Sequence, residues 1–149
     1  MVAPPREICV DASVAAKWLL REGDRHRALA LRADVLGSGG RILAPALLVS
    51  EVTSAIYKKW QAGQMRSELG RLLTAAAGQL SVDVLSPPRL PLRAFEIAAQ
   101  FNLKWIYDAF YVALAEIVGC DLWTADEALY DTVRGTHANV RLLAEYPLT

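Results

Sequence analysis

The sequence of 149 residues has little cysteine and no excess of positive charge. Its two cysteines, Cys9 and Cys120, lie in apolar segments without Cys-x-x-Cys spacing or partner histidines, which argues against a zinc site. They are instead expected to be small core residues in a reducing compartment. The formal net charge is zero, so the chain lacks the strongly basic character of many nucleic-acid-binding domains. Contact with a polyanion is therefore expected to be local or assisted by a metal ion.

Long apolar runs are also missing. The longest apolar stretches are interrupted by Glu51, Asp108 and Glu116, so no segment is expected to span a bilayer. Residues 1–7 lack the apolar core of a signal peptide. These absences predict a soluble, cytoplasmic protein with no membrane partner.

The composition is that of a folded globular chain, with a hydrophobic fraction of 54% and a charged fraction of 21%. The sequence contains no repeat, no low-complexity stretch and no long linker. A chain of this length can bury a proper core, and a single domain over residues 1–149 is expected.

Short apolar strands alternate with amphipathic helices along the chain. The predicted strands cover residues 7–11, 41–44, 80–85, 121–124 and 139–143. The predicted helices cover residues 14–20 (capped by Ser13), 26–36, 47–62, 65–79, 92–101, 106–118 and 126–133. Because the strands are apolar throughout, the pattern predicts an α/β fold whose mostly parallel sheet is covered by helices on both faces.

Four acidic residues stand against apolar sequence, where a carboxylate is costly to bury unless it is paired or binds a metal. They are Asp11, Glu51, Asp108 and Asp126. Asp11 ends the first predicted strand, and Asp126 comes two residues after the strand at 121–124. Glu51 lies in the first turns of the helix that leaves the second strand, and Asp108 near the start of its own helix. All four are therefore expected at the carboxyl edge of the sheet, where ligands bind in open α/β folds. Hard cations prefer oxygen ligands, so the sequence predicts a site for Mg²⁺ or Mn²⁺.

Each acid also has a simpler interpretation. Asp11 and Asp126 occupy positions typical of helix N-caps. Glu51 and Asp108 fit charges that the helix dipole favours in a first turn. Taken singly each signal is weak, and the agreement of four positions on one location favours the metal site.

Other polar residues are interpreted as structural. Asp121 begins a strand at the opposite edge of the sheet, and His26 and His137 lie in polar, arginine-containing loops without a ligand-like partner. The two histidines are predicted to be surface residues.

Four short motifs surround the four acids. They are Val-Asp-Ala-Ser-Val at 10–14 followed by Lys-Trp-Leu at 17–19, the segment 44–52, Tyr-Asp-Ala-Phe-Tyr-Val-Ala-Leu-Ala-Glu at 107–116, and Leu-Trp-Thr-Ala-Asp-Glu-Ala-Leu at 122–129. In order and spacing, over nearly the whole chain, these motifs resemble the PIN-domain ribonucleases, and most closely the VapC-type toxins of bacterial toxin–antitoxin pairs. The third motif is the most specific.

This resemblance implies a PIN-like three-layer α/β/α fold and a Mg²⁺- or Mn²⁺-dependent endoribonuclease. It also implies an RNA substrate, inhibition by a cognate antitoxin protein, and a homodimer. By motif position, the family's catalytic and metal-binding acids correspond to Asp11, Glu51, Asp108 and Asp126. The accessory residues are Ser13 and Thr124, and Thr124 takes the place of a hydroxyl often found near the metal site.

One departure from the family pattern lies three residues after Glu51, where the family often has asparagine. This sequence has Ser54 there, which puts a supporting hydrogen bond in doubt but not the metal ligands.

Three other functions compete with the toxin. The first is a PIN-type nuclease that acts in RNA processing or on DNA, outside toxin–antitoxin systems. The second is a PIN-fold binding module without catalysis. The third is a phosphatase with Asp11 as nucleophile, which is disfavoured because Ser13 stands where such enzymes usually carry a second aspartate.

The helices expected at 47–62 and 65–79 carry many apolar residues, among them Ile56, Tyr57 and Trp60. Some of these could form an exposed groove for a helix or strand of the antitoxin. The alternative is that they pack in the core or in a dimer interface.

Overall fold

The computed structural model describes residues 6–137 and 139–149. Of the N-terminal segment predicted to lack a signal peptide, residues 1–5 lie outside the described part. Within the described part, no helix combines the length and the apolar character that crossing a membrane requires.

Five short strands form one central sheet in the order β3-β2-β1-β4-β5. Their bounds are β1 Glu7–Val10, β2 Arg41–Ala44, β3 Asp83–Val84, β4 Asp121–Thr124 and β5 Val140–Leu142. All four strand pairs are parallel, so the prediction of a mostly parallel α/β sheet is confirmed. The central strand β1 is flanked by β2 and β4, and its carboxyl end therefore lies beside the carboxyl ends of both.

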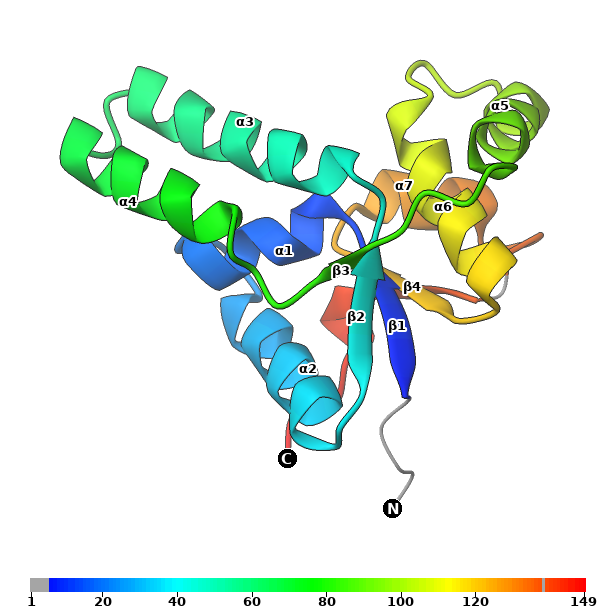
Figure 1. Cartoon of the computed structure of the whole chain (residues 1–149), viewed down its shortest axis with the longest axis horizontal. Coiled ribbons are helices and arrows are strands. Elements are labelled where there is room, and N and C mark those ends of the chain that lie inside the picture. Colours follow the sequence, from blue (N-terminus) through cyan, green and yellow to red (C-terminus); the bar gives the residue numbers. More distant parts are fainter. Residues whose placement is uncertain (1–5, 138) are drawn as a thin grey trace.

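Seven α-helices connect these strands in the described part of the chain. They are α1 Ala12–Leu19, α2 Arg25–Gly37, α3 Leu47–Gln61, α4 Ser67–Ala77, α5 Leu90–Phe101, α6 Tyr107–Val118 and α7 Glu127–Val133, followed by the short 3-10 helix η1 Leu143–Glu145. Figure 1 shows α1 to α4 on one side of the sheet and α5 to α7 on the other. The chain therefore has the three-layer α/β/α architecture that the alternating pattern predicts.

The predicted helices and strands agree with the structure to within a few residues, with two exceptions. The strand predicted over residues 80–85 is reduced to Asp83–Val84, because residue 82 bends back to bond Leu80 and only two residues reach the edge of β2. The cap predicted for the first helix is also wrong. Asp11, not Ser13, is the N-cap of α1, and its side chain accepts a hydrogen bond from the backbone N–H of Val14.

His137 corrects a further prediction, because it is 5% exposed rather than a surface residue. Its backbone N–H bonds the carbonyl of Val133 just after α7, which turns the side chain inward. There the ring meets Phe101 edge-on, and Nε2 lies 3.7 Å from the Glu116 carboxylate. His26 is exposed as expected, but it lies in α2 rather than in a loop.

Helix α6 lies directly against the sheet and contacts β1 and β4. Small residues make this close approach possible, since Ala109 and Ala113 are fully buried. The helix ends at Gly119, whose positive φ of 80° closes the last turn. The N-terminus of α6 is thereby held near the carboxyl edge of the sheet, and this places Asp108.

Candidate active site at the carboxyl edge of the sheet

Asp11 is a buried carboxylate at the point where β1 passes into α1. Its Oδ1 accepts hydrogen bonds from Ser13 Oγ at 2.5 Å and from the backbone N–H of Val14 at 3.3 Å. Its Oδ2 accepts a hydrogen bond from the hydroxyl of Thr124 at the end of β4. The helix-cap interpretation of Asp11 is therefore correct, and it is compatible with a ligand role because a carboxylate has about four acceptor positions.

The two hydroxyls that hold Asp11 also fix the loop between β4 and α7. Ser13 Oγ accepts the backbone N–H of Ala125 at 2.8 Å, and Thr124 Oγ1 accepts that of Asp126 at 3.0 Å. This short network joins the carboxyl ends of β1 and β4. Both residues predicted to be accessory, Ser13 and Thr124, lie in it.

Asp126 stands at the start of α7 and is half-buried. Its Oδ1 accepts the backbone N–H of Leu129 at 3.1 Å, so Asp126 is the N-cap of that helix. The helix start lies next to the Thr124 network, so Asp126 is fixed at the same edge of the sheet as Asp11.

Glu51 reaches the site from α3, and Asp108 reaches it from the first turn of α6. The hydroxyl of Tyr111 donates a hydrogen bond of 2.5 Å to Oε1 of Glu51. Tyr111 was not among the residues predicted for the site. The sequence does contain a pattern that points to Tyr111. It follows Asp108 by three residues, and this spacing places two side chains on one helix face.

Mutual repulsion among the acids shows in the pKa of Asp108. Burial is the largest cause, and together with the charges of Asp126 and Glu51 it raises this pKa to about 6. The pKa of Asp11 is likewise raised to about 6, because burial and the charge of Asp108 outweigh the hydrogen bonds from Ser13, Thr124 and Val14, which lower it. Each of the other three acids is thus coupled by charge to Asp108, and the structure brings all four predicted acids into one electrostatic cluster.

The cluster is not a ready-made coordination sphere. Over residues 6–137 and 139–149, no three histidine, cysteine, aspartate or glutamate side chains converge as a metal-holding group. The donor chemistry nevertheless fits Mg²⁺ or Mn²⁺, because every candidate ligand is a carboxylate oxygen. Mg²⁺ usually keeps several waters and binds through one or two carboxylates, so it does not require three converged side chains. Asp108 suits this role, because none of the residues that the structure describes donates a hydrogen bond that would offset the rise in its pKa.

Ser54, which stands where the family often has asparagine, is exposed on α3. Within the described residues its side chain makes no recorded hydrogen bond.

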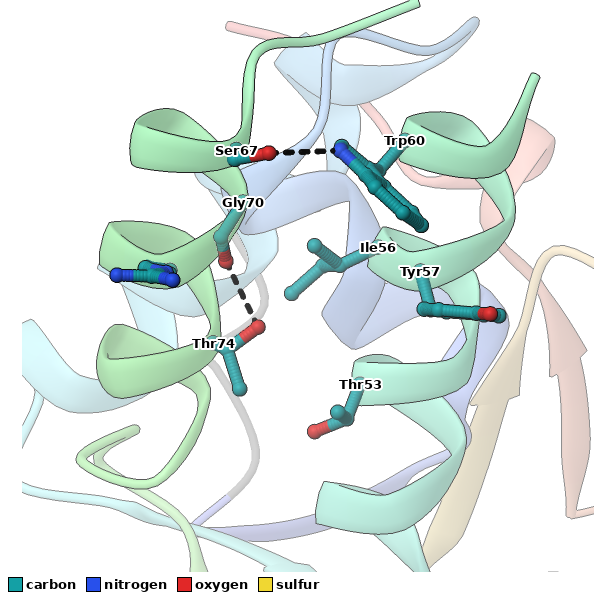
Figure 2. Close-up of a pocket in the computed structure, with 8 residues that line it drawn as sticks. Thr53, Ile56, Tyr57, Trp60, Ser67, Gly70 and Thr74 are labelled. Carbon is teal, nitrogen blue, oxygen red and sulfur yellow. Dashed lines mark hydrogen bonds between the residues drawn. The ribbon is translucent and has the colours of Figure 1, made fainter. Parts of the chain in front are cut away.

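A second feature lies away from the acids, between α3 and α4 (Figure 2). It is a hollow of about 460 Å³, called here the α3–α4 groove, lined by Thr53, Ile56, Tyr57, Trp60, Ser67, Gly70, Arg71 and Thr74. Tyr57 is 55% exposed and Trp60 is 41% exposed, and their ring centroids lie 5.6 Å apart. Trp60 Nε1 donates a hydrogen bond of 3.0 Å to Ser67 Oγ, which links the two helices across the groove. Of the three residues predicted for an exposed groove, Ile56 is buried at its floor and the two aromatic rings reach solvent.

The fold is an α/β/α domain, and the acidic cluster marks a candidate site at the carboxyl edge of its parallel sheet. The family model described as "PIN domain" matches residues 8–135, and the chain belongs to this family. Its relatives are of the VapC type. The chain is 34% identical over 125 residues to VapC ribonuclease Mb0985 of Mycobacterium bovis and, equally, to ribonuclease VapC9 of Mycobacterium tuberculosis, which covers 84% of this chain and 90% of each relative. It is 29% identical over 143 residues to ribonuclease VapC3 of Mycobacterium tuberculosis, covering 91% of this chain and 94% of the relative.

Proposed function

We propose that this chain is a Mg²⁺- or Mn²⁺-dependent endoribonuclease that acts as the toxin of a type II toxin–antitoxin pair. The observation that carries the proposal is the charge coupling of Asp11, Glu51 and Asp126 to Asp108 at one edge of the sheet. The VapC-type relatives support it, because they are named ribonucleases.

The four acids have different surroundings, and each is assigned a different role on that basis. Asp11 and Asp108 are the core ligands, one held rigidly by three donors and the other free of such restraint. Asp126 holds a second cation or orients the attacking water. Glu51 acts through a water as a further ligand, or as the base that orients the nucleophile.

A bound divalent cation supplies a water of lowered pKa and neutralises charge on the scissile phosphodiester. The residues of the chain hold the metal-binding carboxylates in position. Ser13 and Thr124 hold the Asp11 carboxylate in one orientation, and the same hydroxyls fix the start of α7 and with it Asp126. An anionic RNA backbone approaches these carboxylates only when their charge is compensated.

Cleavage of total RNA tests this proposal. Purified, antitoxin-free protein is incubated with total bacterial RNA with Mg²⁺, with Mn²⁺ or with a chelator, and the cut ends are mapped. We expect discrete cuts only when a divalent cation is present, and no cuts by Asp108→Asn. Cutting that persists in the chelator would contradict the metal dependence, and intact RNA under every condition would contradict the activity.

We further propose that the α3–α4 groove binds an apolar segment of the cognate antitoxin. The groove offers two exposed aromatic rings beside Arg71, and an amphipathic helix or an extended strand fits such a surface. The test is co-expression with the cognate antitoxin, sought as a short gene beside the gene of this chain. We expect the double variant Tyr57→Ser/Trp60→Ala to lose co-purification, while Phe95→Ser, an exposed aromatic residue of α5, retains it.

The homodimer implied by the family resemblance stays a proposal. Light scattering of the antitoxin-free protein measures its mass in solution. A mass near twice 16.3 kDa supports the dimer, and a monomeric mass contradicts it. If Tyr57→Ser/Trp60→Ala changes this mass, the groove joins two copies of the chain rather than toxin and antitoxin.

A further inference from the structure

Tyr111 is the largest fully buried side chain in the described part of the chain, with 1% of its surface exposed. It lies on α6 among apolar and small neighbours, where phenylalanine would provide the same packing volume. Tyrosine adds one hydroxyl to that volume, and a buried hydroxyl needs a partner.

The partner of this hydroxyl is Glu51, sixty positions earlier in the chain. The bond joins α6 to α3 with an oxygen–oxygen distance of 2.5 Å, within the range of a hydroxyl bonded to a carboxylate. It engages Oε1, and no other described side chain is hydrogen-bonded to Glu51.

The surroundings of Tyr111 favour a donor that keeps its proton. Burial raises the pKa of Tyr111 above its ordinary value, and the bond to Glu51 and the charges of Glu51, Asp11 and Asp108 raise it further. The hydroxyl therefore remains protonated and presents its hydrogen to Glu51.

We infer that Tyr111 is a positioning residue that fixes the Glu51 carboxylate at the acidic cluster through Oε1 and leaves Oε2 for a cation or the attacking water. The inference rests on the proposed metal-dependent activity and assigns one more residue to the same site. Partners that orient a ligand from outside the coordination sphere typically contribute 10- to 100-fold in metal affinity or activity. Tyr111 therefore acts on function through Glu51, without contact to the substrate.

The test is a double-mutant cycle on two readouts. Wild type, Tyr111→Phe, Glu51→Gln and the double variant are compared for the dissociation constant of Mn²⁺, measured by calorimetry with MnCl₂ alone. The same proteins are compared for the cleavage rate of a fluorescein-labelled RNA pool at fixed Mn²⁺. The matched control is Tyr146→Phe, because Tyr146 also donates its hydroxyl to a carboxylate, that of Asp34, outside the acidic cluster.

We expect Tyr111→Phe to raise the Mn²⁺ dissociation constant about tenfold and to slow cleavage at least as much. In the Glu51→Gln background the same change should add less than a factor of about two, because the two residues act as one unit. Tyr146→Phe should leave both readouts within about twofold of wild type. A purely structural role would lower the melting temperature of Tyr111→Phe without this pattern.

Two results overturn the inference. In the first, Tyr111→Phe binds Mn²⁺ and cleaves RNA like Tyr146→Phe. In the second, the effects of Tyr111→Phe and Glu51→Gln multiply in full. If wild type cleaves RNA without binding Mn²⁺, only the proposed metal dependence is contradicted. The role of Tyr111 is then tested by the double-mutant cycle measured on the cleavage rate. If wild type neither binds nor cleaves, the proposed function and the inference both fall.

Discussion

The buried hydroxyl of Thr124 donates a hydrogen bond to Oδ2 of Asp11, although the two residues lie 113 positions apart. One ends β4 and the other follows β1, so parallel pairing of these two neighbouring strands brings them together. The same hydroxyl accepts the backbone N–H of Asp126. A single side chain thus sets the positions of two of the four candidate metal-binding acids.

Replacing Thr124 by valine keeps the shape of the side chain and removes the hydroxyl. We expect Thr124→Val to lower the free energy of unfolding by about 1–3 kcal/mol, because a buried carboxylate loses a donor and a backbone N–H loses an acceptor. Thr124→Ser should restore most of this loss. Urea unfolding with EDTA measures both effects.

The matched control for this experiment is Thr132→Val. The Thr132 hydroxyl bonds a carbonyl of its own helix on an exposed face, so its loss should cost less than about 0.5 kcal/mol. If both variants lose the same free energy of unfolding, the Thr124 hydrogen bonds between β1 and β4 stabilise the fold no more than an exposed hydrogen bond within a helix.

The raised pKa of Asp108 makes a prediction for stability against pH. Its folded-state pKa of about 6 lies above the ordinary value of 3.8, so the folded protein binds this proton more tightly than the unfolded chain does. Below about pH 4 both states are protonated and Asp108 has no effect. As the pH rises from about 4 to 6, the unfolded chain releases this proton before the folded protein does, so stability falls, and above about 6 the loss is complete.

Asp108→Asn removes that charge. In EDTA at pH 7.5 we expect the variant to be about 1–2 kcal/mol more stable than wild type, a range that allows for solvent screening of a half-buried group. At pH 4.5 only about a third of this gain should remain, because the folded carboxyl is then protonated while the unfolded one is mostly ionised. Asp131→Asn, on the exposed face of α7, is the control and should differ little from wild type at either pH. A destabilised Asp108→Asn at pH 7.5 would show that Asp108 has a favourable partner in the metal-free protein.

The sheet was predictable from the sequence because its strands are short, apolar and separated by amphipathic helices. The three strands at the site, β1, β2 and β4, were found almost to the residue, and the four acids follow from their positions at strand ends and helix starts. The length of the edge strand β3 was overestimated, because an apolar run indicates that residues are buried but not that they pair with a neighbouring strand. Residues 80–82 are apolar in part, yet they bend away before β3 begins.

Long-range contacts explain what the sequence analysis missed. The hydroxyl of Tyr111 has its partner on another helix, and nothing near Tyr111 in the sequence marks Glu51. His137 was assigned to the surface because its local sequence is polar, whereas its burial comes from Phe101 and Glu116 on α5 and α6. Such contacts follow from how the elements pack, and the local pattern of residues does not specify packing.

Divalent cations should stabilise the folded protein, since they bind a cluster that unfolding disperses. At a concentration about ten times the dissociation constant, mass action contributes about 1.4 kcal/mol, which corresponds to a rise of about 3–6 °C in melting temperature. We expect Mg²⁺ or Mn²⁺ to give this rise at pH 7.5 and a smaller one at pH 5, where protons compete for Asp11 and Asp108. Calorimetric melting with and without EDTA measures it, with Ca²⁺ as a comparison ion. An unchanged melting temperature at millimolar Mn²⁺ would contradict the metal site.

Alanine at Asp11 and at Asp108 should separate structure from chemistry. Asp108→Ala removes a carboxylate that receives no hydrogen bond from residues 6–137 or 139–149, so we expect the fold to persist and RNA cleavage to fall by on the order of a hundredfold or more. Asp11→Ala should also abolish cleavage. It removes the cap of α1 and a hydrogen-bond partner of Thr124 as well, and should therefore lower the free energy of unfolding by about 1–3 kcal/mol. Urea unfolding and RNA cleavage are measured on the same preparations, with Asp131→Ala as the control for both. Full cleavage by Asp108→Ala would remove that residue from the site, and unchanged stability of Asp11→Ala would show that its three hydrogen bonds do not hold α1 to the sheet.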